Sequence, residues 1–245
     1  AIFSRFIDTV MAGLKWTAVM VYMDDVLIFS PTLQHHLESL EAVFKRINEF
    51  GLRFKAKKCF IAVPEVRFLG HLVTRGGIKP DPQKTMAITD MEMPKTKGEL
   101  RSALGLFGYY RRFCKRFSAV AHPLQEALKK ENRLGRDEHG EVQWTDDQRG
   151  AFDQLRDVLA SSPVLAHPNW DSPFAVHTDA CKHGLGATLT QVVDGKEMVV
   201  CYASRALAPR LLLKSVPSMS RSLRSMPDWS DASQPSSASV ITSLT

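Results

Sequence analysis

Two adjacent carboxylates, Asp24 and Asp25, stand between two apolar, β-prone runs at residues 18–23 and 26–30. Burying two like charges side by side is costly, because each loses solvation and each repels the other. Three interpretations are open: the pair forms an exposed hairpin tip, it caps a neighbouring element, or it holds divalent cations. The third would serve phosphoryl transfer, since Mg²⁺ prefers carboxylate oxygen and two ions can stabilise the attacking and leaving oxygens.

A basic and aromatic stretch, residues 95–116, is the second feature suited to chemistry. Tyr109 and Tyr110 are interleaved there with basic residues, namely Lys95, Lys97, Arg101, Arg111, Arg112, Lys115 and Arg116. Such a stretch can follow a phosphate backbone through contacts that are independent of base sequence and sensitive to salt. The alternative is a solvated basic surface with no such partner.

The distribution of charge favours a polyanionic partner for the first half of the chain. Net charge is +6, yet residues 1–130 hold 21 Lys and Arg against 12 Asp and Glu, whereas residues 131–209 hold 7 against 12. A polyanion would be expected to dock on the first half, and the alternative from charge alone is a basic surface with no such partner. The four cysteines include no C-x-x-C pair, which predicts reduced thiols in an intracellular protein. No apolar run approaches the ~18 residues that span a bilayer, so no membrane partner is expected.

Hydrophobic periodicity predicts the elements that position these residues. Helical patterns occur at residues 2–14, 34–50, 83–91, 97–117 and 118–130. Thr96 and Glu99 form a capping box that starts the helix at 97–117. Strands flank the acid pair, which is predicted to lie in a tight turn, and further strand patterns are a run over 59–63 and a hairpin over 66–74 closing at Gly76-Gly77.

The second half of the chain has its own pattern. The polar stretch 131–140 lacks periodicity and is predicted to be a linker. Thr145 and Gln148 form a capping box that starts a helix. Three strands are predicted after it, at 174–179, 184–191 and 199–204, with Asp194-Gly195 turning the second into the third. Residues 210–245 contain 11 serines and no glutamate, which predicts disorder.

The string Tyr22-Met23-Asp24-Asp25 is similar to the Y-x-D-D signature on the palm hairpin of reverse transcriptases. Further segments resemble the same family in the same order: Phe3–Asp8 of the palm helix, Val66–His71 of the primer-grip hairpin, Gly77–Lys84, the thumb-like Leu104–Phe113, and Pro163–Leu165, Thr178–Ala180 and Gly184–Ala187 of a tethered ribonuclease H-like domain. Residues 1–209 thus resemble a fragment of the reverse transcriptase and ribonuclease H polyprotein of gypsy-type LTR retrotransposons.

The resemblance implies roles for the polymerase residues. Asp24 and Asp25 would bind Mg²⁺ or Mn²⁺, with Asp25 as the supporting second carboxylate. Tyr22 and Met23 would lie near the primer end and the incoming deoxynucleotide triphosphate. The primer's terminal phosphate would be held by the hairpin residues Phe68, Leu69, Gly70 and His71. An ordinary apolar hairpin is the alternative for these four residues.

The resemblance also implies contacts to a primer–template of RNA and DNA and a second metal site. The backbone contacts would come from Arg101, Tyr109, Arg111, Arg112, Lys115 and Arg116. Asp179 would be the first metal-binding acid of the ribonuclease H site, the alternative being a strand cap. The remainder of a polyprotein would be a further partner. The implied location is intracellular, in a cytoplasmic particle or the nucleus.

Several acids of the family pattern have no match in this sequence. The polymerase site of the family takes another aspartate from an earlier palm strand, and the ribonuclease H site takes a Glu and two further Asp after the third strand. The pattern stops at Pro209, and a frameshift there would explain the serine-rich tail. We therefore expect negligible activity from this exact chain. The alternatives are a non-catalytic nucleic-acid-binding module and a transposon remnant without function.

The expected fold is α+β, with helices and sheets in successive parts. These parts are a truncated polymerase palm (1–77), a helical thumb (78–130), a linker (131–140), a partial ribonuclease H-like α/β domain (141–209) and a disordered, frameshifted tail (210–245). The edge at which earlier palm strands would pair is expected to be exposed and prone to aggregation.

Overall fold

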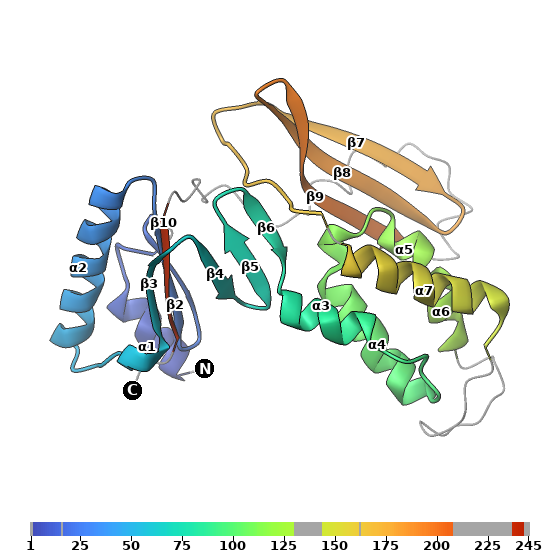
Figure 1. Cartoon of the computed structure of the whole chain (residues 1–245), viewed down its shortest axis with the longest axis horizontal. Coiled ribbons are helices and arrows are strands. Elements are labelled where there is room, and N and C mark those ends of the chain that lie inside the picture. Colours follow the sequence, from blue (N-terminus) through green and yellow to red (C-terminus); the bar gives the residue numbers. More distant parts are fainter. Residues whose placement is uncertain (1, 16, 130–143, 162, 208–236, 243–245) are drawn as a thin grey trace. The chain divides into compact units, whose positions relative to one another are not determined.

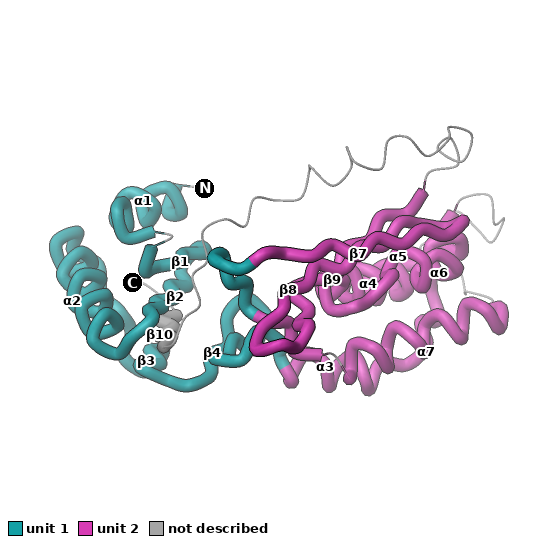
Figure 2. The backbone as a smooth tube through the Cα atoms, turned by 90° about the horizontal axis from the view of Figure 1, so that it is seen from above, with its two compact units in different colours: residues 1–81, 167–172, 227–245 teal, residues 82–166, 173–226 magenta. Residues whose placement is uncertain are grey.

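The computed structural model describes residues 2–15, 17–129, 144–161, 163–207 and 237–242. The chain divides into two compact units (Figure 2). Unit 1 comprises residues 1–81, 167–172 and 227–245, and unit 2 comprises residues 82–166 and 173–226. The fold is mixed helix and sheet, as predicted. The predicted linker 131–140 lies outside the described residues.

Unit 1 is built on a four-stranded antiparallel sheet, which we call the palm sheet (Figure 1). Its strands lie in the order β1 (Val19–Tyr22), β2 (Asp25–Ser30), β10 (Ser237–Thr242) and β3 (Cys59–Val63). Helices α1 (Ile2–Val10) and α2 (Leu33–Glu49) belong to the same unit, and the short 3-10 helix η1 (Ala56–Lys58) leads into β3.

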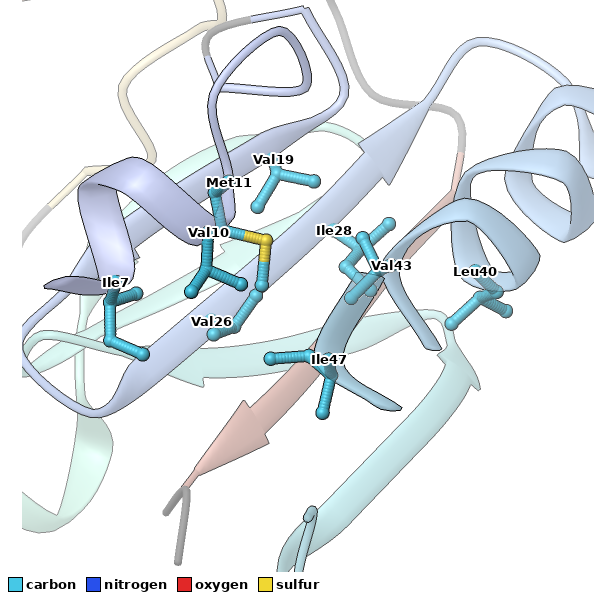
Figure 3. Close-up of a cluster of buried hydrophobic side chains, with 9 residues drawn as sticks. All are labelled: Ile7, Val10, Met11, Val19, Val26, Ile28, Leu40, Val43 and Ile47. Carbon is cyan, nitrogen blue, oxygen red and sulfur yellow. The ribbon is translucent and has the colours of Figure 1, made fainter. Parts of the chain in front are cut away.

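The sequence of strand β2 is apolar at every position from Val26 to Phe29 because both faces of the strand are buried. Side chains alternate between the two faces of a strand. Val26 and Ile28 join the cluster of Figure 3, which also contains Ile7, Val10, Met11, Val19, Leu40, Val43 and Ile47 of the helices and β1. Leu27 and Phe29 point to the opposite face and pack with Val66 and Phe68. Both faces of β2 are therefore buried.

A second sheet in unit 1 has three strands in sequential order, β4 (Glu65–Phe68), β5 (His71–Thr74) and β6 (Gly77–Pro80). The hairpin predicted over 66–74 is present, but it closes at Leu69 and Gly70. Gly76 belongs to the next turn, between Thr74 and Gly77. One long hairpin was the wrong interpretation, because two closely spaced turns separate three short strands.

The C-terminal strand β10 corrects a prediction. We predicted disorder for residues 210–245, but Ser237–Thr242 form a strand that pairs with β2 on one side and β3 on the other. Residues 210–236 and 243–245 lie outside the described residues. Backbone hydrogen bonds to β10 satisfy one side of β2, and β1 and β3 are the outer strands of this sheet among the described residues. Aggregation at an exposed palm edge therefore stays a prediction.

Unit 2 contains helices of different lengths and a three-stranded sheet. Its helices are α3 (Pro82–Thr89), α4 (Lys97–Tyr109), the 3-10 helix η2 (Arg111–Phe113), α5 (Phe117–Val120), α6 (His122–Ala127) and α7 (Asp146–Ala160). The sheet is antiparallel in the order β7 (Phe174–Cys181), β8 (Gly184–Val193) and β9 (Lys196–Ala206).

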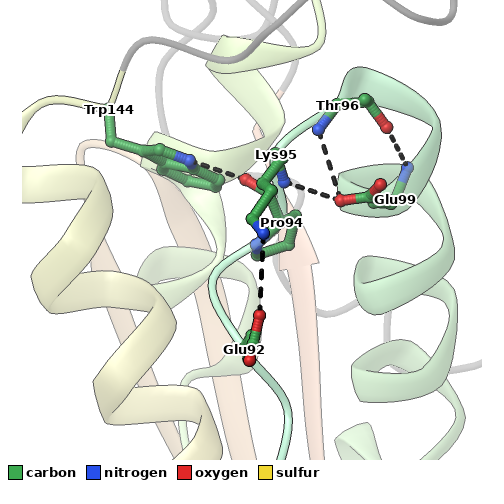
Figure 4. Close-up of polar contacts among 6 residues, drawn as sticks. All are labelled: Glu92, Pro94, Lys95, Thr96, Glu99 and Trp144. Atoms are coloured by element: carbon green, nitrogen blue, oxygen red, sulfur yellow. Dashed lines mark hydrogen bonds and ion pairs between the residues drawn. The ribbon is translucent and has the colours of Figure 1, made fainter.

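Capping decides where the long helices of unit 2 begin. Thr96 and Glu99 form the predicted capping box of α4, drawn in Figure 4, and Thr145 and Gln148 form that of α7. The side chain of Trp144, just before α7, donates a hydrogen bond of 2.8 Å to the carbonyl oxygen of Pro94 (Figure 4). These contacts tie the start of α7 to the segment that precedes α4.

The predicted helices at 97–117 and 118–130 differ from the structure. Helix α4 ends at Tyr109, and the chain then continues through η2 to Arg116, whose backbone is left-handed. Two short helices, α5 and α6, take the place of the second predicted helix. Left-handed backbone at Arg116 cannot continue a right-handed helix, so it separates η2 from α5.

No helix among the described residues is long and apolar enough to cross a membrane.

Candidate catalytic and nucleic-acid-binding sites

The acid pair lies at the tip of the β1–β2 hairpin. Tyr22 pairs with Asp25 across the hairpin, so Met23 and Asp24 form a two-residue turn. Met23 has a φ of +55°, a backbone conformation that is unfavourable for a side-chain-bearing residue but suits tight hairpin turns. The prediction of two strands joined at the acid pair is confirmed, with Asp25 as the first residue of β2 rather than part of the turn.

The residues around the acid pair are open to solvent. Tyr22 and Met23 are 50% and 59% exposed, Asp24 is exposed, and Asp25 is half-buried. The turn holds the large apolar side chain of Met23 at the surface in an unfavourable backbone conformation. Such strain persists only where the surrounding structure fixes it, and it is common at functional sites.

Burial and repulsion act together on Asp25. Burial is the largest cause that raises the pKa of the Asp25 carboxyl, and the neighbouring charge of Asp24 raises it further, while Lys58 lowers it. A bound cation would oppose both raising effects.

The acid pair fits Mg²⁺ in the type of its donors but falls short in their number. Hard divalent cations take carboxylate oxygen. However, the described residues include no group of three or more His, Cys, Asp or Glu side chains able to hold a metal. The strand next to Asp25 adds no carboxylate, because Thr242 is the Cα partner of Asp25 and the segment 237–242 contains no acidic residue.

The predicted primer-binding hairpin is anchored to the palm sheet through one of its own residues. Phe68 is only 7% exposed and packs in the core with Leu27 and Phe29. Leu69 and Gly70 form the turn, with φ values of +47° and +66°. His71 is half-buried, and its Nδ1 lies 2.6 Å from the carbonyl oxygen of Leu69. Phe68 and His71 thus flank the turn as strand partners, but the side chain of Phe68 is buried in the core.

Asp81 holds this turn and was missed by sequence reasoning. Its backbone N–H donates a hydrogen bond of 3.0 Å to the carbonyl oxygen of Gly70. Its carboxylate lies 3.6 Å from Nε of Arg67, and the side chain is only 10% exposed. The signal available in the sequence was an aspartate between two prolines, Pro80 and Pro82. The sequence did not indicate that this aspartate is buried or that Arg67 is its partner.

The predicted backbone-contact residues of the thumb separate into two groups. Arg101, Tyr109 and Lys115 are exposed on α4 and the segment after it. The Tyr109 ring is 52% exposed and lies edge-on, at 4.9 Å between ring centres, against Tyr110, which is only 1% exposed. The Tyr109 ring is therefore solvent-exposed and packs against the buried Tyr110 ring.

The second group contacts the β7–β9 sheet of the same unit. Arg111 donates a hydrogen bond to the carbonyl oxygen of Ser204 on β9. Burial lowers the pKa of the Arg112 guanidinium below its ordinary value. Arg116 forms an ion pair with Asp179 on β7. Arg111 and Arg116 are themselves exposed, whereas Arg112 is half-buried. Nothing local in the sequence indicates that this segment lies beside the β7–β9 sheet.

Asp179 lies inside β7 rather than at its end, in register with Gly186 of β8. A small hollow beside it is lined by Arg116, Ala119, Cys181 and Gly184, among others. The partner of Asp179 in this hollow is the Arg116 guanidinium.

Two family descriptions match separate parts of the sequence. "Reverse transcriptase (RNA-dependent DNA polymerase)" matches residues 1–73, and "RNase H-like domain found in reverse transcriptase" matches residues 144–216. The first match contains the acid pair and the Phe68–His71 turn, and the second contains Asp179.

Curated proteins similar to this chain are transposon polyproteins. The Pol polyprotein from transposon 297 of Drosophila melanogaster is 35% identical over 191 residues, covering 78% of this chain and 17% of that protein. The Pol polyprotein from transposon gypsy of the same species is 36% identical over 195 residues, covering 78% and 19%. The Tf2-3 polyprotein of Schizosaccharomyces pombe is 31% identical over 215 residues, covering 87% and 16%. The chain thus spans about a fifth of the length of these relatives.

Solved structures of foamy viral protease-reverse transcriptase share the fold. A complex with double-stranded DNA superimposes with a TM-score of 0.72 and 25% identity, covering 85% of this chain and 35% of that one. A complex with an RNA/DNA hybrid gives a TM-score of 0.69 and 26% identity, covering 85% and 27%.

Proposed function

We propose that this chain, which is similar to Pol polyproteins of LTR retrotransposons and matches a reverse transcriptase segment followed by a ribonuclease H-like segment, serves RNA-directed DNA synthesis as part of such a polyprotein. Its nucleic-acid substrate is a primer–template of RNA and DNA. Foamy viral relatives bound to double-stranded DNA and to an RNA/DNA hybrid support this substrate class. Deoxynucleotide triphosphates are the second substrate.

The acid pair at the β1–β2 turn is the observation that carries this proposal. Asp24 is exposed at the tip of the hairpin, and Asp25 stands beside it with a raised pKa. A divalent cation would offset the repulsion between these two carboxylates and would take their oxygens as ligands. Tyr22 and Met23 flank them as exposed side chains able to contact a primer end.

In this proposal, Asp24 and Asp25 hold Mg²⁺ or Mn²⁺, and the ion supplies positive charge next to the reacting phosphate. A complete site needs a further carboxylate, which the described residues do not bring to this hairpin. The remainder of the polyprotein is therefore a required partner for catalysis. These 245 residues by themselves are expected to give negligible primer extension.

Primer extension on a primed RNA template with Mg²⁺ tests this proposal, comparing the chain with Asp24→Asn. We expect no extension from either chain alone. Extension by the chain that is lost in Asp24→Asn would show that these residues form a complete polymerase site. To test the role of the pair, the same substitution is placed in a polymerase-active polyprotein that contains this segment. Retained extension there would remove Asp24 from the proposed site.

A non-catalytic nucleic-acid-binding module is the second candidate, and the Tyr109 ring favours it. The exposed Tyr109 ring rests against the buried Tyr110 ring, so it can stack on a nucleotide at little entropic cost. Stacking between an aromatic side chain and a nucleobase contributes about 1–3 kcal/mol. Arg101 on the same helix and Lys115 after it add charge for phosphates. This role requires no metal.

Binding to primer–template across a salt series tests the second candidate. Arg101→Ala should weaken binding equally for unrelated sequences and flatten the salt dependence by about one unit of slope. Arg149→Ala is the matched control, because Arg149 is an exposed arginine on α7, outside the predicted contact set. Equal effects of the two variants, or no binding by the chain, would exclude the thumb as a binding surface.

A further inference from the structure

The strand position between β2 and β3 is filled by a segment from far along the sequence. β2 ends at Ser30 and β3 begins at Cys59, and the chain between them, which includes α2, supplies no strand to the sheet. Strand β10 lies between the two and pairs antiparallel with both (Figure 1). β2 and β3 are therefore joined through a segment that neither of them adjoins in the sequence.

Backbone pairing holds β10 along the whole length of β2. The register covers all 6 residues of β2, from Ser30 to Asp25. On the other side it runs from Val63 to Cys59 of β3, with one irregularity. Backbone hydrogen bonds of this kind do not depend on side-chain identity, so a different extended segment can make them equally well.

The surroundings of this position restrict which segments fit. Val26 and Ile28 belong to the buried cluster of Figure 3, and Leu27 and Phe29 belong to the cluster on the opposite face. Facing residues of neighbouring strands share one side of a sheet, so four consecutive residues of the occupant stand beside buried apolar side chains. This chain has Ala238-Ser239-Val240-Ile241 at these register positions, small or apolar throughout. A charged residue there would lose its solvation.

The filling segment lies outside both parts of the sequence that match a family description. These parts are residues 1–73 and 144–216, whereas β10 begins at Ser237. The first part contains β1, β2 and β3, but none of its described residues occupies the position between β2 and β3. This chain covers only 17% and 19% of two of the curated relatives, so most of such a polyprotein lies outside it. Another occupant therefore has ample sequence to come from.

We propose that the position between β2 and β3 is an acceptor site for an extended segment of the rest of the polyprotein, and that β10 is a self-supplied occupant that blocks it. The partner pairs antiparallel with β2 and is small or apolar at the four positions beside Val26–Phe29. The inference rests on the proposed function in one respect, because the proposed function names the polyprotein as the source of this partner.

Blocking this site also affects the surroundings of the acid pair. Thr242 is the Cα partner of Asp25, so the end of β10 lies beside the β1–β2 turn. Because β1 already pairs with the other side of β2, a segment can join β2 by backbone pairing only where β10 lies. A polyprotein segment that adds to the palm sheet next to Asp25 must therefore displace β10 first.

Oxidative cross-linking to Cys59 reports whether β10 occupies the site. Ile241 is the Cα partner of Cys59, so Ile241→Cys places a thiol on the facing strand. A synthetic peptide of residues 234–245 should lower the disulfide yield about twofold or more, at concentrations on the order of millimolar that match a tethered segment. The same peptide with Val240→Asp is the matched control, and it should leave the yield unchanged because it brings a charge beside Leu27. Equal effects of the two peptides, or no effect of either, would overturn the acceptor site.

The partner is tested by comparing the isolated chain with a polymerase-active polyprotein that contains residues 1–245. Ile241→Cys should cross-link to Cys59 in the isolated chain and lose most of this cross-link in the polyprotein. Equal yields in the two proteins would overturn the displacement of β10, and no cross-link in either would overturn its occupancy of the site. Primer extension by the same polyprotein with Asp24→Asn tests the proposed function separately. Retained extension there would remove Asp24 from the polymerase site and leave the exchange of β10 standing.

Discussion

Ile241 lies opposite Cys59 in the register of the palm sheet, which places the C-terminal strand β10 directly beside β3. On its other side, the same strand pairs with β2 from Ser30 to Asp25. β10 therefore occupies the position in the sheet between the strand that begins at Asp25 and the strand that begins at Cys59. An added strand of this kind satisfies the backbone groups that an edge would otherwise leave open.

This register predicts an engineered disulfide. Facing residues of antiparallel strands have Cα atoms about 4.5–5.5 Å apart, which suits a disulfide bond. Ile241→Cys should therefore form a bond with Cys59 under mild oxidation, detected by mass spectrometry of a non-reduced digest. Burial raises the pKa of the Cys59 thiol, so the bond should form faster as pH rises and the reactive thiolate increases.

Ser239→Cys is the control for this experiment, since its Cα partner on β2 is Ile28. It should give no bond to Cys59. Equal yields from the two variants would mean that residues 237–242 do not hold this register in solution.

The raised pKa of Asp25 predicts how stability depends on pH. A folded-state pKa above the ordinary value of 3.8 means that the folded chain binds this proton more tightly than the unfolded chain. The free energy of unfolding therefore decreases as pH rises from about this value through the folded pKa. Asp25→Asn removes the ionisation and should stabilise unit 1 at neutral pH, by less than about 1 kcal/mol because solvent screens the site.

Urea denaturation at acidic and neutral pH measures this effect. The difference between Asp25→Asn and the parent chain should shrink at acidic pH, where both side chains are uncharged. Asp24→Asn should give a smaller stabilisation, because the charge of Asp24 is the lesser cause of the shift. A neutral-pH loss of stability in Asp25→Asn would contradict the assigned causes.

Phe68 is predicted to act on stability rather than directly on primer binding. Its side chain is 7% exposed and packs with Leu27, Phe29 and Val66, so Phe68→Ala should lower the free energy of unfolding by roughly 3–5 kcal/mol. The half-buried His71 is the comparison, because His71→Ala should cost much less stability and lower affinity for primer–template. Thermal unfolding and primer–template binding are measured on both variants. A larger loss of stability in His71→Ala than in Phe68→Ala, with the larger loss of affinity in Phe68→Ala, would contradict this prediction.

Two glycines of unit 2 should respond to alanine in opposite directions. Gly105 lies inside α4 with no atom within 4 Å of an added Cβ, so Gly105→Ala should stabilise the chain by about 0.5–1 kcal/mol through helix propensity. At Gly184 the added Cβ would lie 2.9 Å from a backbone oxygen, so Gly184→Ala should destabilise it. Denaturant midpoints measure both effects, and a stabilising Gly184→Ala would show that β8 can move away from β9.

Local chemistry explains which elements were predictable. The capping boxes at Thr96 and Thr145 depend on residues only three positions apart, and both are present. Asp194 and Gly195 both have positive φ and join β8 to β9, as the Asp-Gly pair predicted. The position of the acid pair at a hairpin turn was also predictable from neighbouring residues, because the apolar runs on each side leave room only for a tight turn.

Contacts between distant segments were not predictable in this way. Nothing near Arg116 in the sequence indicates Asp179, 63 residues away, and nothing near Ser118 indicates Ser204, 86 residues away. The helix predicted to continue to residue 117 ends at Tyr109, and the residues after it contact the β7–β9 sheet. Tertiary contacts therefore decided which basic residues of the thumb also contact the β7–β9 sheet.

The resemblance to reverse transcriptases, the acid pair and most of the strands and helices could be read from the amino-acid sequence alone, because they depend on short motifs and on hydrophobic periodicity. Three features could not be read from the sequence: β10 lies within the palm sheet, Asp81 holds the turn at Gly70, and Arg116 pairs with Asp179. Each of these depends on packing between segments far apart in the chain. The free energy of such contacts comes from burial and charge pairing in three dimensions, which no local pattern records.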